Sequence, residues 1–296
     1  MSILFVRRRN LGRGSTRGMA QWLRSQGIPV KIWRNDRRMP DVNPSLIVRW
    51  GCTSTVSMRD GQKVLNAANG IHAVNNKAGF RRKLIIDQPE IVPRSVVHIE
   101  GNTYNNMDPQ GSLQEPVILR PGTHSRGRNL DVVQRGSAAI LAASMGYTDW
   151  YASVLHQKVA EYRVYVYDGR VVSVAEKTPD NPDAVAWNVA QGGEFSVVRW
   201  GAWPLDVCRV AIEGMKHSNL TFGGVDVMVT EERGPLLIEI NSAPSLPALS
   251  DGSISYRQTC MAKAIKWSYE QKDVPSVENY GNWRDVIHPA ISGETV

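Results

Sequence analysis

The chain has 296 residues, of which 42% are hydrophobic and 21% are charged, and it carries a net charge of +7. This length suffices for a sizeable core, in one large domain or in two to three small ones. No apolar run approaches the roughly 20 residues of a membrane-spanning helix, and the short apolar start lacks the long core of a signal peptide. Three widely spaced cysteines predict neither a disulfide framework nor a zinc site. We therefore expect a cytoplasmic protein with no membrane contact.

The positive charge is concentrated at the N-terminal end. Residues 1–50 hold ten Arg and one Lys against two Asp, a net +9, so the other 246 residues carry −2. Such a segment suits nucleic acid or a small anionic substrate. It contains no recognisable nucleic-acid module and does not interleave its basic residues with several aromatic ones, as a single-strand groove does. Nucleic acid is therefore the lesser of the two alternatives.

The first part of the chain is typical of a small open α/β domain, because strand and helix patterns alternate there. We expect strands over residues 3–6, 30–33 and 46–50 and an amphipathic helix over residues 16–25. Residues 12–18 contain three glycines and resemble a dinucleotide fingerprint only loosely. This segment is either a substrate-facing loop or a structural turn. The arginines around it either bind an anionic acceptor or form a solvated rim, and they stand at positions 7, 8, 9, 13 and 17.

The middle of the chain predicts a basic helix, short strands and a long polar segment. We expect the helix over residues 77–84, strands over residues 91–93 and 117–120, and a loop over residues 101–114. The second strand leads into residues 121–128, a glycine-bearing loop with five hydrogen-bonding side chains. Loops of this composition wrap phosphates, because glycine lets the backbone approach closely, but an ordinary surface turn has the same composition.

Two alternating runs follow, over residues 162–167 and 171–177, and Asp168-Gly169 between them is a strong hairpin signal. Arg163 and Lys177 lie on these strands, where they either reach a cleft or remain solvated. Helices are expected over residues 206–217 and 256–270, and an irregular tail over residues 273–296.

Three oxygen-bearing side chains stand out near the C-terminal end. Glu239 and Asn241 are two residues apart in an apolar run, so on a strand they point to the same face. A hairpin through residues 231–234 would bring Asp226 beside them. Two carboxylates and one amide carbonyl suit Mg²⁺, which prefers hard oxygen ligands and the phosphates of a nucleotide. The alternative is that all three are solvated at strand ends, although an unpaired carboxylate in this apolar run would cost several kcal/mol.

In this order, the motifs resemble those of the ATP-grasp superfamily of carboxylate–amine ligases, which includes ribosomal-protein glutamate ligases, glutathione synthetases and D-alanine–D-alanine ligases. The resemblance covers residues 76–270. It implies the ATP-grasp fold of the α/β (α+β) class, in which two α+β lobes enclose the nucleotide next to a small N-terminal α/β domain. The corresponding segments are the N-terminal domain 1–75, the central lobe 76–154 with the glycine loop, the C-terminal lobe 155–272 with the Mg²⁺ site, and the tail 273–296.

The resemblance also assigns nucleotide contacts. Arg120 stands where the family usually carries a lysine that touches the phosphates, and residues 156–159 match the hinge whose backbone pairs with adenine. Residues 188–193 are similar to an Asn-x-x-x-Gly-Gly element of the family. The implied ATP-binding residues are Lys77, Arg120, Gly122, Ser125, Gly127, Gln157, Lys158, Val159 and Asn188.

Catalytic and metal-binding residues follow from the same resemblance. Residues 161–166 match an acid-x-Arg strand, in which Arg163 would stabilise the oxyanion of a tetrahedral intermediate. Lys177 falls where many members carry a basic residue near the transferred phosphate. Three residues match the family's Mg²⁺ ligands in type and order: Asp226, Glu239 and Asn241. The resemblance implies two Mg²⁺ ions, for which Mn²⁺ can substitute.

The function implied by this resemblance is an ATP-dependent ligase that forms an amide or peptide bond through an acyl phosphate and releases ADP. Its partners would be ATP, a carboxylate and an amine, with an anionic amino acid, peptide or protein tail as acceptor. Family members often form dimers or tetramers, so a homo-oligomer is compatible with the resemblance. The alternatives are a phosphotransferase on the same scaffold and, less favoured, a basic nucleic-acid-binding protein.

Overall fold

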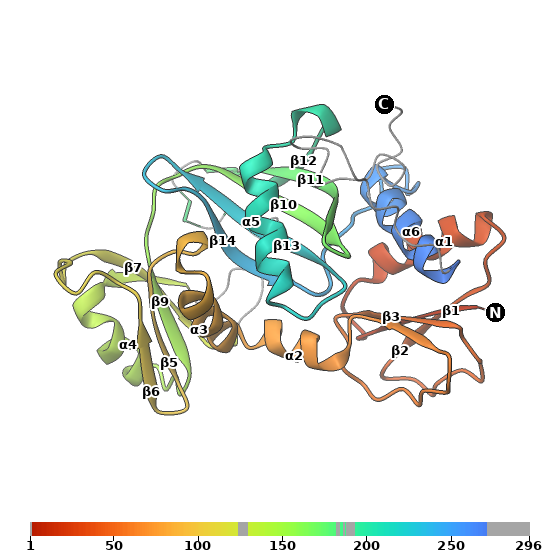
Figure 1. Cartoon of the computed structure of the whole chain (residues 1–296), viewed down its shortest axis with the longest axis horizontal. Helices are drawn as coiled ribbons and strands as arrows, with labels where there is room; N and C mark the ends of the chain where they lie inside the picture. The colour runs from red at the N-terminus through yellow and green to blue at the C-terminus, as the bar shows by residue number, and fades with distance from the viewer. Residues whose placement is uncertain (1, 124–129, 182–183, 186, 188–192, 271–296) are drawn as a thin grey trace.

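The computed structural model describes residues 2–123, 130–181, 184–185, 187 and 193–270, and these residues contain three sheets (Figure 1). The first is a parallel sheet of order β2-β1-β3-β4 near the N-terminus. Its central strands are buried along their whole length, which is typical of a parallel sheet covered on both faces. The three predicted strands are confirmed, and the sheet has a fourth. Its strands are β1 (Ile3–Arg7), β2 (Val30–Arg34), β3 (Leu46–Trp50) and β4 (Lys63–Leu65).

Helix α1 (Arg13–Ser25) begins three residues earlier than predicted. Gly12 precedes it with φ of 66°, and the Thr16 hydroxyl donates to the Gly12 carbonyl at 2.8 Å. Residues 13–18 are therefore helical, and the predicted loop over residues 12–18 is wrong. Helix α1 packs against helix α6 (Tyr256–Tyr269), and a glycine is required at Gly18 because a Cβ there would meet the Gln258 side chain.

Gly12 offers a direct test of this corner. A Cβ on Gly12 would lie 2.2 Å from Cδ1 of the fully buried Trp50, and L-residues are strained at this positive φ. We expect Gly12→Ala to lower the free energy of unfolding by about 2 kcal/mol or more, measured by urea denaturation. The matched control is Gly14→Ala, where a Cβ meets no atom within 4 Å and the helix should gain up to about 1 kcal/mol. Equal stability of the two variants would contradict this packing.

The second sheet is antiparallel, with the order β6-β5-β9-β7-β8, and helix α4 lies beside it. Two helices, α2 and α3, connect it to the N-terminal sheet (Figure 1). The predicted strand over residues 91–93 is wrong, because this segment is a 3₁₀ turn (Pro89–Ile91) ahead of the true strand. The predicted loop over residues 101–114 contains strand β6. The elements are α2 (Ala68–Asn75), α3 (Lys77–Asp87), β5 (Ser95–Ile99), β6 (Asn102–Asn105), β7 (Pro116–Pro121), β8 (Asp131–Gln134), α4 (Ala138–Ser144) and β9 (Trp150–Val154).

The third sheet is also antiparallel and has the order β12-β11-β10-β13-β14. Successive residues of β10 point to opposite faces, as expected for a strand. Val164 and Val166 pack in one core with α5, whereas Tyr165 and Tyr167 pack in another with α1 and α6. The C-terminal sheet therefore shares a core with the N-terminal sheet. The elements are β10 (Lys158–Tyr167), β11 (Arg170–Thr178), β12 (Glu194–Val198), α5 (Leu205–Lys216), β13 (Phe222–Thr230) and β14 (Gly234–Asn241).

The predicted hairpin at Asp168-Gly169 is confirmed, since both residues have positive φ, 48° and 71°. The hairpin through residues 231–234 is also confirmed. The helices predicted near residues 206–217 and 256–270 correspond to α5 and α6. The predicted tail lies outside the described residues. Within the described part of the chain, no helix is both long enough and apolar enough to span a bilayer.

Candidate active site

A cavity of about 920 Å³ lies between the second and third sheets. Ile118 and Tyr151 line it from the second sheet, and Asp226 and Glu239 line it from the third. Its volume falls in the range of small-molecule sites, and charged side chains converge on it from one face of the third sheet. This combination of an apolar wall with convergent polar groups marks the cavity as the candidate active site.

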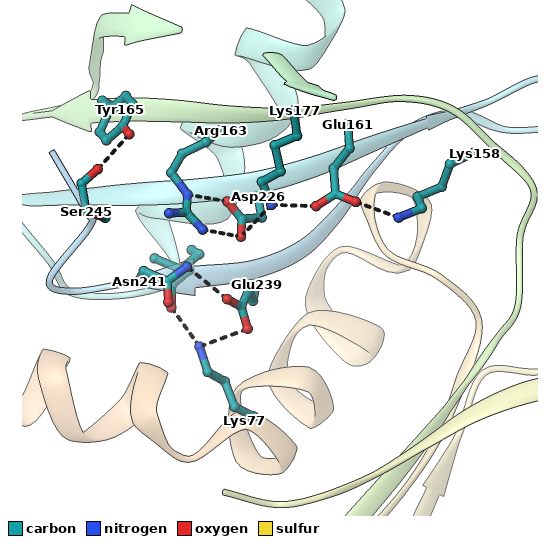
Figure 2. Close-up of polar contacts among 11 residues, drawn as sticks. Lys77, Lys158, Glu161, Arg163, Tyr165, Lys177, Asp226, Glu239, Asn241 and Ser245 are labelled. Carbon is teal, nitrogen blue, oxygen red and sulfur yellow. Dashed lines mark hydrogen bonds and ion pairs between the residues drawn. The ribbon is translucent and has the colours of Figure 1, made fainter. Parts of the chain in front are cut away.

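A chain of ion pairs crosses the floor of this cavity (Figure 2). Arg163 donates from Nε and Nη2 to the two carboxylate oxygens of Asp226, at 2.6 and 2.7 Å. Lys177 Nζ lies 3.0 Å from Asp226 Oδ2 and donates to Glu161 Oε1 at 2.5 Å. Lys158 Nζ donates to the other oxygen of Glu161 at 2.7 Å. Three basic side chains thus meet two carboxylates, which leaves one excess positive charge to face an anionic ligand.

The register of the third sheet explains this convergence. Arg163 is paired with Asp226 on β13 and with Ala175 on β11. Because side chains alternate along a strand, Glu161 shares the face of Arg163, and Lys177 shares the face of Ala175. The acid-x-Arg spacing on β10 and the lysine on β11 therefore meet on one face of the sheet.

Burial and charge act in opposite directions on these groups. Burial disfavours the charged form of Asp226, but Arg163 and Lys177 together hold the pKa of its carboxyl below the ordinary value. Burial likewise opposes the charge on Arg163, yet Asp226 raises the pKa of its guanidinium. At Lys158 burial prevails and lowers the pKa of the amine, although Glu161 acts in the opposite direction.

The lowered pKa of Asp226 predicts a pH dependence of stability. Its ionised form contributes stability that is fully present above the ordinary Asp pKa of about 4 and is lost as pH falls through the lower pKa of the folded state. We expect the gap in free energy of unfolding between wild type and Asp226→Asn to be constant above about pH 5 and to shrink at lower pH. Denaturant unfolding at a series of pH values measures this gap. Asp206→Asn, an exposed acid on α5, should follow the wild-type curve throughout.

The other two predicted metal ligands lie at the end of β14. Glu239 is the pairing partner of Asp226 on β13, and Asn241 Nδ2 donates to Glu239 Oε1 at 2.9 Å. Lys77, at the start of α3, lies 3.6 Å from Glu239 Oε2 and donates to the Ile240 carbonyl at 2.9 Å (Figure 2). The fold therefore brings the three predicted ligands to adjacent strands, with Lys77 beside them.

The donor set of these three side chains fits Mg²⁺, because all the candidate atoms are hard oxygens. Among the described residues, no group of three His, Cys, Asp or Glu side chains could hold a metal, so the site would depend on the Asn241 amide as its third ligand. The side chain of Glu239 is 23% exposed, against 5% for Asp226. Because both oxygens of Asp226 already contact Arg163 or Lys177, Glu239 and Asn241 are the more accessible donors.

The predicted nucleotide contacts are placed less uniformly. Arg120, Gln157 and Lys158 line the cavity, and Lys158 Nζ also lies 4.5 Å from the Trp187 ring centroid. Gly122 instead fixes the start of α3, since its carbonyl accepts from the amides of Lys77 and Ala78. Val159 is 49% exposed. The predicted contacts Ser125, Gly127 and Asn188 lie outside the described residues.

Arg81 and Phe195 are among the described cavity residues that the sequence analysis missed. Arg81 lies on α3 four residues after Lys77, so it faces the same side of the helix. Its Nη2 donates to the Ile238 carbonyl at 2.7 Å, and its guanidinium lies 5.7 Å from the Tyr151 ring centroid. Phe195 on β12 lines the cavity beside Arg163. The helical spacing from Lys77 was a usable signal for Arg81, whereas Phe195 stands in a short strand that the sequence did not predict.

Comparison with known protein families identifies the fold. Residues 83–263 match the RimK-like ATP-grasp domain, which is more than half of the chain. The chain belongs to this family. The ATP-grasp fold predicted from the motifs is thereby confirmed, with the mixed α/β architecture described above.

The relatives of this ATP-grasp domain are named as ligases. A probable alpha-L-glutamate ligase of Shewanella halifaxensis is 26% identical over 225 residues, which cover 74% of this chain and 47% of the relative. A probable alpha-L-glutamate ligase of Parasynechococcus marenigrum is 28% identical over 224 residues, covering 71% of this chain and 45% of the relative. The chain thus spans about half the length of these curated relatives.

Solved structures share the fold at low sequence identity. The ATP-grasp ligase PsnB, complexed with minimal precursor, Mg and ADP, superposes with a TM-score of 0.62 at 13% identity, covering 90% of this chain and 97% of that one. The D-alanine–D-alanine ligase of Bacillus anthracis complexed with ATP gives a TM-score of 0.60 at 11% identity, covering 91% of this chain and 96% of that one.

Proposed function

We propose that this RimK-like ATP-grasp protein is an ATP-dependent carboxylate–amine ligase that forms a C–N bond and releases ADP and phosphate. The observation that carries the proposal is the ion-pair chain Lys158–Glu161–Lys177–Asp226–Arg163 on the floor of the cavity, next to Glu239 and Asn241. The names of the curated relatives support the proposal and make L-glutamate the first substrate to test.

The cationic side chains are placed to hold the nucleotide. Lys158, in the predicted adenine hinge at residues 156–159, and Arg120 line the cavity, and Lys77 stands at the metal end. The donors that would hold Mg²⁺, or two such ions with Mn²⁺ as a substitute, are Asp226, Glu239 and Asn241. When bound, the metal would supply positive charge to the phosphate oxygens of ATP. The glycine loop over residues 122–128 and Asn188 remain predicted nucleotide contacts.

The reaction follows from these positions. A substrate carboxylate oxygen attacks the γ-phosphorus of ATP, the bond to the β-phosphate oxygen breaks, and ADP leaves with the electron pair. The amine then attacks the carbonyl carbon of the acyl phosphate, loses a proton, and expels inorganic phosphate. Arg163 would stabilise the negative oxygen that develops in the second step, because Asp226 binds the Nε and Nη2 edge of the guanidinium and leaves Nη1 outside that pair. Lys177 would act on the transferred phosphate.

The proposal keeps the other sequence-based expectations in place. These are a cytoplasmic location, a possible homo-oligomer, and the boundaries of the N-terminal domain, the two lobes and the tail at residues 75, 154 and 272. The five arginines singled out in the N-terminal region, at positions 7, 8, 9, 13 and 17, differ in burial. Arg7 is buried and donates to the carbonyls of Arg8 and Arg9, whereas the other four are exposed and suit the anionic substrate predicted for this end.

The test is an assay of condensation by mass spectrometry. The full chain is incubated with ATP, Mg²⁺, L-glutamate and a panel of amino acids and acidic peptides. A product heavier than its acceptor by one glutamate residue, formed together with ADP, is the expected result. Release of ADP without any condensation product would favour phosphoryl transfer instead. If neither ADP nor a condensation product forms, the result contradicts the proposal.

A further inference from the structure

Arg257, in the first turn of α6, is a buried arginine without a counter-ion in the described part of the chain. The residue is 7% exposed, and neither a hydrogen bond nor an ion pair joins its guanidinium to any described residue. Its Nε and Nη1 are both fully enclosed. Burial of a guanidinium is costly unless something compensates its charge, and the described residues supply no anion here, only the Phe195 ring 5.8 Å away.

The backbone at Arg257 is fixed rather than adaptable. Ser255 and Gln258 form a capping box at the start of α6, and Gln258 Nε2 also donates to the Gly14 carbonyl of α1 at 3.2 Å. The amide of Leu246 donates to Ser15 Oγ at 2.9 Å, which ties the segment after β14 to the same corner. A cation in the first turn of a helix is also opposed by the helix dipole. The charge of Arg257 is therefore opposed both by the lack of a counter-ion and by the helix dipole, and a bound anion would offset both.

This arginine adjoins the cavity through Phe195. The ring centroid of Phe195 lies 5.8 Å from Arg257 Cζ, 4.9 Å from Arg163 Cζ and 5.7 Å from Lys177 Nζ. Arg163 and Lys177 are paired with carboxylates, as described above, whereas Arg257 is not. Phe195 and Pro244 form apolar lining on this side, and such lining strengthens a charge-assisted contact by excluding water.

Arg257 lies near the end of the cavity that is opposite the predicted nucleotide end. Along β10, Lys158 and Tyr165 lie at opposite ends of the ion-pair chain (Figure 2), and Tyr165 donates to the Ser245 carbonyl. Lys158 belongs to the end with the predicted adenine hinge. Arg257 belongs to the other end, because Tyr165 and Tyr256 share a core there with α1 and α6. A ligand group that reaches Arg257 beside Phe195 would therefore belong to the substrate rather than to the base of ATP.

We propose that Arg257 binds a carboxylate of the substrate that is not itself activated, such as the second carboxylate of a dicarboxylic amino acid. The guanidinium edge is suited to two parallel hydrogen bonds with a planar carboxylate, which gives orientation as well as charge. This inference rests on the proposed ligase function and adds a specificity-determining residue to it.

The test compares Arg257→Gln with Arg257→Lys and with Arg209→Gln, an exposed arginine on α5 that serves as the matched control. The full chain is loaded with Mg²⁺ and a non-hydrolysable ATP analogue, and L-glutamate is titrated by calorimetry. If the condensation assay identifies another acid, that acid is the probe. We expect Arg257→Gln to weaken binding of the acid at least tenfold and to change the affinity for the ATP analogue less than twofold. The affinity of Arg257→Lys for the acid should lie between those of Arg257→Gln and wild type, and the affinity of Arg209→Gln should equal that of wild type.

Thermal unfolding separates this role from a structural one. Because Arg257 has no hydrogen-bond or ion-pair partner among the described residues, Arg257→Gln without ligand should unfold at the wild-type temperature or above it. A clearly lower unfolding temperature, an equal loss of affinity for nucleotide and acid, or unchanged binding of the acid would each overturn the inference. Absence of any condensation product from the wild-type protein would instead refute the ligase function itself.

Discussion

Arg163→Ala is expected to reduce product formation at least about a hundredfold and to lower the free energy of unfolding by about 3 kcal/mol. The side chains of Arg163 and Asp226 are 13% and 5% exposed, so the substitution leaves a buried carboxylate without its bidentate partner. The loss of stability should lie near the lower end of the range for broken buried pairs, because Lys177 remains 3.0 Å from Asp226. Urea denaturation and the rate of ADP release measure the two effects.

The double variant Arg163→Ala, Asp226→Ala separates stability from catalysis. Removal of both charges should recover much of the lost stability, because no unpaired carboxylate remains, whereas turnover should stay low. Arg209→Ala, which breaks the exposed pair of Arg209 with Asp206, should change neither quantity. Wild-type turnover in Arg163→Ala would remove this residue from the proposed mechanism.

Glu239→Gln should abolish Mg²⁺-dependent ADP release and leave the fold intact. The amide keeps the size of the side chain, and only the carboxylate charge that would bind the metal is lost. Because Glu239 is partly exposed and its ion pair with Lys77 is long, at 3.6 Å, we expect a small change in the free energy of unfolding. ADP release is measured over a range of Mg²⁺ concentrations, together with circular dichroism to verify the fold.

Glu213→Gln on α5 is the matched control, since Glu213 pairs with Lys216 away from the cavity. It should release ADP as the wild type does at every Mg²⁺ concentration. ADP release by Glu239→Gln at the wild-type rate would refute the assignment of Glu239 as a metal ligand. A shift of the Mg²⁺ requirement to higher concentration, without loss of maximal rate, would indicate that Asp226 and Asn241 suffice to hold the metal.

Local patterns predicted much of the C-terminal sheet. The alternation along residues 162–167 and 171–177 and the turn at Asp168-Gly169 specified β10, β11 and their register, because strand period and turn chemistry are local properties. The same logic placed Asp226, Glu239 and Asn241 on adjacent strands. Their roles as metal ligands stay predictions, as do the nucleotide contacts.

Local patterns failed where packing overrides propensity. Glycines at positions 12, 14 and 18 suggested a loop, yet helix α1 forms there because it packs against α6. Residues 91–93 are apolar enough for a strand but belong to a 3₁₀ turn and its exit, where Ile91 and Val92 are buried in the core under α3. Neither outcome is encoded within a short window of sequence.

The sequence by itself therefore determined the ATP-grasp fold, the two hairpins and the residue types of the candidate site, since these depend on period, turn residues and motif order. Only the tertiary structure decided which charges are neutralised. Arg163 and Lys177 share Asp226 through strand register. Arg257, distant in sequence from all of them, lies against Phe195 of the cavity wall with no acid beside it among the described residues. The pairing of charges depends on contacts between segments far apart in the chain, and burial makes each unpaired charge costly enough to indicate a ligand.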